Sequence, residues 1–279
     1  MPADSREALR LTRLAADAGD ARAQSNLGVD YAFGQTVPQD SSEALKWLRR
    51  AADQDYAYAF GALADLYWDG KGVPESKDQA RDLYRKAMDK MRLSAEQGDA
   101  SSLLFLANMY NQSRSVPEDP AQALSYYRKA AERGLPPAEN IVGYFYATGR
   151  GTPEDDLEAV MWYRKAADQG NSDAQANLCY MYDMGLGVAK DYDKAVQWCR
   201  QSADRGNPLG QFDLAISYSG GYGVPKDVVE AYKWFLLAET GGHKQATDRM
   251  NELAKRMSGA QVAEAQRRAS DWAAQHPKK

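Results

Sequence analysis

Residue types that carry catalytic or metal chemistry are scarce in this chain of 279 residues. Cysteine and histidine occur twice each, and His243 and His276 have no cysteine near them at ligand spacing, so there is no structural zinc pattern. Ser-x-x-Lys, Gly-x-Ser-x-Gly and His-Glu-x-x-His are all missing. Gly-x-Gly occurs four times, but each copy lacks the strand and third glycine of a dinucleotide loop. We therefore expect no enzyme, no cofactor and no metal.

The chain also lacks long apolar runs and a strong charge of one sign. No run approaches the roughly 18 residues that span a bilayer, and the first residues have no uninterrupted apolar core like that of a secretory signal. The net charge of -4 argues against a basic nucleic-acid footprint. We expect no membrane span and no nucleic-acid partner. The expected location is cytoplasmic as the sequence is written, or periplasmic or secreted if a signal peptide has been removed.

What the sequence does contain is a repeated unit. Matching tyrosines at 31, 67, 110, 146, 182 and 218 are spaced by 36, 43, 36, 36 and 36 residues, and an alanine follows each after thirteen residues, at 44, 80, 123, 159, 195 and 231. A fixed period of roughly 20 to 50 residues indicates a solenoid or array. Six units are therefore present.

Each recurrent position has a structural role. In the fifth unit, Ala174, Leu178 and Tyr182 at four-residue spacing predict the inward face of a first helix over about 172–184. The glycines at 185 and 187 predict its end and a tight turn. Asp191 is expected to cap a second helix over about 191–205. A glutamate three residues after the capping aspartate predicts capping boxes at Asp40/Glu43, Asp155/Glu158 and Asp227/Glu230.

Small Ala195 predicts close approach of the second helix to the first at Cys179, a position that holds Gly28 or Gly143 in other units. Because Cys179 and Cys199 lie on these two helices, a disulfide is geometrically conceivable. Cysteine is also among the most buried residue types, and we expect two buried free thiols. The pair does not fix the compartment.

The unit A-x-x-x-L-[G/A/C]-x-x-Y-x-x-G-x-G-V-x-x-D-x-x-x-A-x-x-W-[Y/C/F]-x-x-[A/S]-A-x-x-G resembles the Sel-one-like repeat (SLR), a relative of the tetratricopeptide repeat, over about residues 5–257. The resemblance implies an α/α solenoid that scaffolds protein complexes, often in signalling, envelope or host-interaction settings.

The expected fold is all-α, a right-handed α/α superhelical solenoid of six helix-turn-helix repeats of the 36-residue type in a single domain over 1–279. Its parts are an N-terminal half repeat (5–20), repeats over 21–56, 57–99, 100–135, 136–171, 172–207 and 208–243, and C-terminal capping helices over 244–279. The second repeat has seven extra residues, which predict a second helix longer by two turns that protrudes. The third repeat lacks both loop glycines, so its loop at 111–120 should be atypical. Ser258 and Gln261 predict a capping box on a closing helix that buries Val262, Ala265, Ala269 and Trp272 on one side.

The expected function is a non-catalytic scaffold that binds a peptide or protein segment in the concave groove. One alternative is an envelope-associated protein or enzyme for small ligands or cell-wall fragments, as implied by cysteine-rich relatives with a disulfide in each repeat. Another is a structural spacer, and the oligomeric state stays open. By analogy with tetratricopeptide arrays, first-helix positions not used for packing should face the groove; they hold Tyr58, Asp65, Trp68, Leu104, Asn108, Asn111, Asn140, Tyr144, Asp173, Tyr180, Asp183 and Phe212. For the rings of Tyr144, Tyr180 and Phe212, packing against the neighbouring unit is the competing interpretation.

Overall fold

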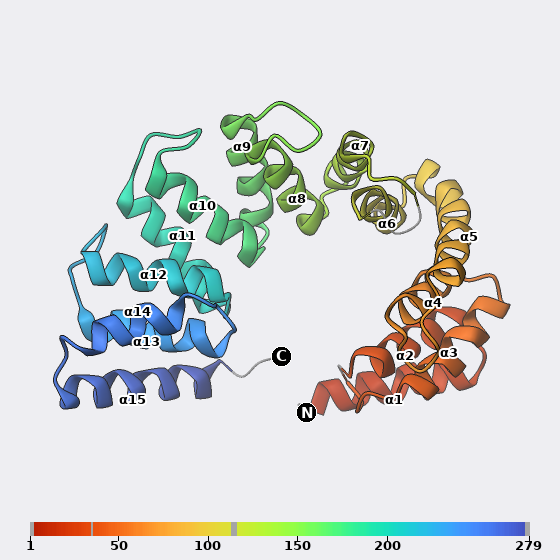
Figure 1. Ribbon diagram of the computed structural model, residues 1–279, viewed down its shortest axis with the longest axis horizontal. Helices are drawn as coiled ribbons and strands as arrows, with labels where there is room; N and C mark the ends of the chain where they lie inside the picture. Colours follow the sequence, from red (N-terminus) through yellow and green to blue (C-terminus); the bar gives the residue numbers. More distant parts are fainter. Residues whose placement is uncertain (1–2, 35, 113–115, 277–279) are drawn as a thin grey trace. The chain divides into compact units, whose positions relative to one another are not determined.

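The computed structural model describes residues 3–34, 36–112 and 116–276, with residues 3–5 described for the backbone alone. Within these residues the chain forms fifteen α-helices in consecutive pairs (Figure 1). The fold is all-α, as the repeat pattern predicts. It divides into two compact units, Met1–Tyr126 and Tyr127–Lys279, with the boundary inside helix α7.

The first unit holds the half repeat and the pairs that follow it. Helix α5 has 20 residues against 13 in α3, which confirms that the extra residues of the second repeat lengthen its second helix. Residues 113–115 of the loop expected to be atypical lie outside the described part of the chain. The helices are α1 (Ala3–Asp17), α2 (Ala21–Phe33), α3 (Ser41–Asp53), α4 (Ala57–Asp69), α5 (Lys77–Glu96), α6 (Ala100–Asn111) and the first part of α7 (Pro120–Ala131).

In the second unit, helices α10 to α13 follow one another as neighbours, and α15 packs against α13 (Figure 1). The predicted bounds of the fifth repeat, about 172–184 and 191–205, match α10 and α11 within a residue or two. The helices are α8 (Pro136–Ala147), α9 (Asp156–Asp168), α10 (Ser172–Met184), α11 (Tyr192–Asp204), α12 (Pro208–Gly220), α13 (Val228–Thr240), α14 (Ala246–Ala254) and α15 (Gly259–Gln275).

The repeated alanines are buried where paired helices pack together. Ala44, Ala80, Ala159 and Ala231 have no exposed surface, and Ala195 is 3% exposed. A side chain larger than a methyl group has no space there, which explains why every unit keeps alanine at this position.

The expectation of free thiols is wrong, because the structure joins Cys179 to Cys199 in a disulfide with their Cα atoms 5.2 Å apart. Residues twenty apart on the two helices also lie in close contact in the first and fourth repeats. A Cβ atom added at Gly28 would lie 2.6 Å from the side chain of Leu48, and one added at Gly143 would lie 2.6 Å from that of Tyr163. Other repeats fill this gap with one small and one large residue. The fifth repeat places two cysteines there, at a Cα separation that suits a disulfide.

The helix starts correct a second expectation. Asp40 and Asp227 cap their helices as predicted, accepting hydrogen bonds from Glu43 N and Glu230 N. The reciprocal bond of a capping box does not form, because the N–H of each capping aspartate already donates to the carbonyl of the repeat tyrosine, for example Asp40 to Tyr31 at 2.9 Å. The glutamates bind lysines instead. In α15 the predicted box of Ser258 with Gln261 is present.

The repeat tyrosine also links successive helix pairs through its hydroxyl group. The guanidinium of an arginine eighteen residues earlier donates to it, as in Arg164 to Tyr182 and Arg200 to Tyr218, both at 2.7 Å. An arginine stands at this distance before all six tyrosines. The sequence interpretation gave the tyrosine a packing role and missed this bond.

The closing helix α15 covers the end of the second unit. Ala265 and Ala269 are buried, and the Trp272 ring meets that of Trp234 edge to face at 5.7 Å. This confirms the predicted apolar side.

Candidate functional site

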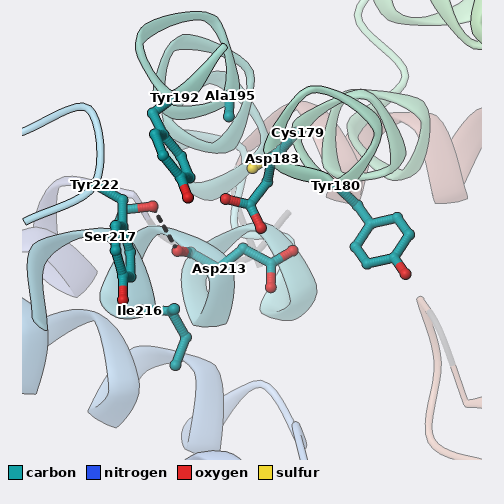
Figure 2. A pocket seen from close by; sticks show the side chains of 9 residues that line it. All are labelled: Cys179, Tyr180, Asp183, Tyr192, Ala195, Asp213, Ile216, Ser217 and Tyr222. Carbon is teal, nitrogen blue, oxygen red and sulfur yellow. Dashed lines mark hydrogen bonds between the residues drawn. The ribbon is translucent and has the colours of Figure 1, made fainter. Parts of the chain in front are cut away.

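A cavity of about 240 Å³ lies in the second unit, between α10, α11, α12 and the loop after α12 (Figure 2). Two carboxylates and three tyrosine rings dominate its walls, and the lining residues include no lysine, arginine or histidine. They are Cys179, Tyr180, Asp183, Tyr192, Ala195, Asp213, Ile216, Ser217 and Tyr222.

The Gly-x-Gly loop after α12 builds one side of the cavity. Gly221 ends α12 with φ of 80°, and a Cβ atom at Gly223 would collide with the backbone of Tyr192. The loop can therefore lie directly on the start of α11, and this contact stacks the Tyr222 ring on the Tyr192 ring at 5.3 Å and 23°. One repeat earlier the corresponding residues are Leu186 and Asp156, so the aromatic pair is particular to this place.

The two carboxylates come from neighbouring first helices. Asp183 lies near the end of α10 and Asp213 lies in the middle of α12, and Figure 2 shows their carboxylates turned toward one another. Burial, with a smaller contribution from the negative charge of Asp183, raises the pKa of Asp213 to about 7. Near neutral pH, Asp213 is thus poised between its charged and neutral forms.

The disulfide closes the inner wall. A carboxylate oxygen of Asp213 and the sulfur atoms of Cys179 and Cys199 lie within 4.8 Å of one another. These three side chains have the chemistry of metal ligands, but cysteine binds metals as a thiolate. Because the two sulfur atoms are bonded to each other, the group does not present a thiolate ligand set in this form.

Of the residues expected to face a groove, the structure brings Tyr180 and Asp183 together at this cavity. The Tyr180 ring is 50% exposed and extends away from the carboxylates (Figure 2). Tyr144, one repeat earlier, is 49% exposed. These two rings stand at the same position of successive first helices and are not buried against a neighbouring repeat.

Other expected groove residues of the second unit contact residues of their own or the next repeat. Phe212 is buried, with its ring 5.5 Å from Phe235 and 4.1 Å from the His243 ring. Asn140 accepts a hydrogen bond from Asn177 at 3.0 Å. Asp173 accepts one from Asn207 at 2.6 Å.

In the first unit the expected groove residues are spread over α4 and α6. Asp65 accepts a hydrogen bond from the hydroxyl of Tyr84, and the Trp68 ring lies 6.3 Å from the ring of the same tyrosine. Leu104, Asn108 and Asn111 are partly buried on α6.

A wider hollow of about 930 Å³ lies in the first unit, between α2, α4, α5 and α6. Of the expected groove residues it includes Tyr58, whose ring packs edge to face with Phe105 at 6.4 Å. Arg22 and Lys90 line it together with aspartates. Its charge is therefore mixed, unlike that of the cavity in the second unit.

Sequence reasoning missed Asp213, Tyr192 and Tyr222. The available signal was the departure of these positions from the repeat, since no other unit has a tyrosine at the positions of Tyr192 and Tyr222, or a carboxylate at that of Asp213. That departure shows which residues the repeat does not need, but it does not show that they meet in space.

Among the described residues, no helix has the length and apolar character to cross a bilayer. The family model of the Sel1 repeat matches residues 1–20, 21–56, 61–90, 100–135, 136–171, 172–207 and 208–243. No curated protein matches the chain.

Among solved structures, the chain is similar to a protective antigen with an SLR fold that is present in uropathogenic Escherichia coli strains. The two are 33% identical with a TM-score of 0.65, over 94% of this chain and 56% of the antigen, so this chain spans just over half of the antigen's length. It is similar to a Sel1 repeat protein from Oxalobacter formigenes, at 31% identity and a TM-score of 0.64, over 97% of this chain and 80% of that one. An immunity protein from Pseudomonas aeruginosa, 20% identical with a TM-score of 0.52 over 80% of this chain and 83% of its own, shares the fold.

Proposed function

Because the chain belongs to the Sel1 repeat family, whose members commonly mediate protein interactions, we propose that it is a non-catalytic scaffold that binds a peptide or protein segment along the first helices of its repeats. The observation that carries the proposal is the pair of half-exposed rings, Tyr144 on α8 and Tyr180 on α10. Tyrosine rings contribute much of the energy at protein interfaces. The two rings are 36 residues apart, so a segment that crosses α8 and α10 meets one ring in each of these two repeats.

A peptide display library panned against the full chain tests the proposal. Peptides recovered from it are synthesised, and their affinities are measured by calorimetry for the parent and for the double variant Tyr144→Ala/Tyr180→Ala. We expect the double variant to bind at least about tenfold more weakly, or 1.4 kcal/mol. Its melting temperature should change by only a few degrees because both rings are half exposed.

Leu157→Ala is the matched control. Leu157 is 61% exposed at the start of α9, a second helix, so its removal takes away an exposed apolar side chain from outside the proposed surface. Equal loss in the control and the double variant would contradict the assignment of the surface. Recovery of no binding peptide would favour a structural spacer.

A second candidate function is the binding of cell-wall fragments, which requires a location outside the cytoplasm, and the disulfide favours that location. Structural disulfides form and persist in oxidising compartments such as the bacterial periplasm, and we propose an extracytoplasmic location on this ground. Calorimetry with purified cell-wall fragments tests the ligand. A response to fragments together with none to any peptide would replace the scaffold by this second function.

The location has its own test. The protein is isolated from its native cells with thiols blocked at lysis, and its mass is measured without reduction. A chain whose cysteines are both unblocked, and whose mass is two hydrogens below that of the reduced chain, would support an oxidising compartment. Two blocked thiols would contradict it.

A further inference from the structure

We propose that the cavity between α10, α11 and α12 receives the positively charged end of a lysine or arginine side chain from a bound segment. The inference rests on the proposed scaffold function and specifies the chemistry of the partner. It follows from the two carboxylates, the tyrosine rings and the lack of a cation in contact with Asp213 among the described residues.

The carboxylates of the cavity have no cation in direct contact among the described residues. Neither Asp183 nor Asp213 forms an ion pair or accepts a side-chain hydrogen bond from any residue that the structure describes. Two neighbouring negative charges in a partly buried site disfavour each other. The raised pKa of Asp213 has burial and Asp183 as its causes, which indicates an unmet need for positive charge. A cation in the cavity would remove both penalties.

The tyrosines suit the same occupant. In Figure 2 the Tyr192 ring extends from α11 toward the two carboxylates, and its hydroxyl oxygen can accept a hydrogen bond from an ammonium or guanidinium group. Lys190 already lies 4.7 Å from the centre of the Tyr192 ring, so this ring attracts a cation of the protein itself. A hydrogen bond to Tyr192 and, with a smaller effect, the charge of Asp183 raise the pKa of Lys190, so this lysine acts on the Asp183 side of the cavity. Lys190 does not line the cavity, and the causes of the raised pKa of Asp213 are burial and Asp183. The position beside Asp213 is therefore left for another cation.

The cavity also lies where a bound segment would pass. Tyr180 belongs both to its lining and to the surface of half-exposed first-helix rings. When the backbone of a segment packs on Tyr180, a long side chain of that segment can reach Asp183 and Asp213. A lysine or arginine can span this distance with its apolar stem against the rings and its charge at the carboxylates.

The occupant can be tested without knowing the partner, by NMR titration of the full oxidised chain at pH 8. The probes are Nα-acetyl-lysine methylamide and Nα-acetyl-arginine methylamide, with the norleucine and citrulline analogues as neutral counterparts. We expect the basic probes to shift the signals of Tyr192 and Tyr222, and the neutral analogues to bind at least about tenfold more weakly. Equal binding of the neutral analogues, or no shift with either basic probe, would overturn the proposal.

Variants locate the site. Asp213→Asn should weaken the basic probes at least about tenfold, and Tyr222→Leu should weaken them without changing the net charge. Asp204→Asn removes the same charge from an exposed position at the far end of α11, and the affinity should stay the same. Unchanged affinity in Asp213→Asn, with the fold verified by its melting temperature, would overturn the proposal even if the probes bind elsewhere.

The outcome separates this inference from the scaffold function. If recovered peptides depend on Tyr144 and Tyr180 but tolerate replacement of every lysine and arginine, the scaffold stands and the cation site is refuted. If the basic probes bind through Asp213 while no peptide depends on the two rings, the cation site stands and the scaffold surface is refuted.

Discussion

Two partly buried carboxylates in the second unit, Asp213 in the cavity and Glu230 at the start of α13, have opposite surroundings. Burial alone would raise the pKa of Glu230, but hydrogen bonds from Lys233 and Arg268 outweigh it and hold this pKa below its ordinary value. The bond lengths are 2.8 Å to both cations. Asp213 has only the negative charge of Asp183 as an ionised neighbour, and its pKa rises to about 7.

The difference distinguishes a carboxylate that stabilises the fold, Glu230, from one that has the surroundings of a binding site, Asp213. Arg268 comes from the closing helix α15, so the ion pair of Glu230 fastens the end of the unit to α13. In the middle of the unit no described cation forms an ion pair with Asp213, although burial also raises the pKa of this carboxyl group. A carboxylate that weakens the fold in this way is typical of a binding site.

The largest expected effect comes from removing the disulfide between Cys179 and Cys199, which forms the inner wall of the cavity. The double variant Cys179→Ala/Cys199→Ala should lose about 2 to 4 kcal/mol of unfolding free energy, since a disulfide that closes a loop of this length contributes about that much. Urea denaturation measures the loss. A reducing agent should destabilise the parent by a similar amount and leave the variant unchanged. A parent that is insensitive to reduction would show that the cysteines are free, as the sequence alone led us to expect.

Replacing each carboxylate by its amide should have opposite effects on the two sites. Asp213→Asn should raise the unfolding free energy at pH 8 by about 1 to 3 kcal/mol, because one pKa unit corresponds to about 1.4 kcal/mol and the variant removes an uncompensated buried charge. The folded-state pKa of Asp213 lies above its unfolded value. Its contribution to stability is therefore fully present below about pH 4 and is lost as the pH rises toward 7. The variant should abolish this part of the pH dependence.

Glu230→Gln is the matched control, since it changes the same chemical group in a site that has two cations. Its pKa is held below the ordinary value, so its stabilising contribution is present above the unfolded pKa and is lost as the pH falls. We expect this variant to be less stable than the parent at pH 8. Two variants that shift in the same direction would remove the distinction between the sites.

These comparisons could be drawn only in part from the sequence. The period of 36 residues determines the helix bounds, the buried alanines and the glycine turns, because packing between like repeats demands the same residue at each copy. It also places Tyr180 and Asp183 on first helices. It does not show that Asp213 meets Asp183, because that contact joins two repeats through residues that do not recur. The disulfide was missed for a similar reason, since the cysteines replace a small and large pair that occurs in other repeats.

The smallest expected effect concerns a third buried carboxylate, Glu139 on α8, which lies between the two extremes. It is 4% exposed, and it accepts one hydrogen bond, from Gln169 at 2.6 Å. Burial raises its pKa and the charge of Lys165 opposes the rise. Three other repeats have glutamine at this position, at 24, 175 and 211. The amide of Gln175 donates to the carbonyl of Ala167 at 3.1 Å.

Glu139→Gln should therefore gain about 0.5 to 1.5 kcal/mol, the usual net value of a hydrogen bond. The new amide can donate to the carbonyl of Ala131, as Gln175 does to that of Ala167. Its oxygen can still accept from Gln169, as Gln24 accepts from Gln54 at 2.8 Å. Because the pKa of Glu139 is raised in the folded state, the parent loses stability as the pH rises through that value. The gain measured by urea denaturation should be larger at pH 8 than at pH 5. The opposite change, Gln175→Glu, should lose stability, and the loss should be larger at pH 8 than at pH 5. A gain that is independent of pH would mean that the charge of Glu139 is already compensated, and would place it beside Glu230 and apart from Asp213.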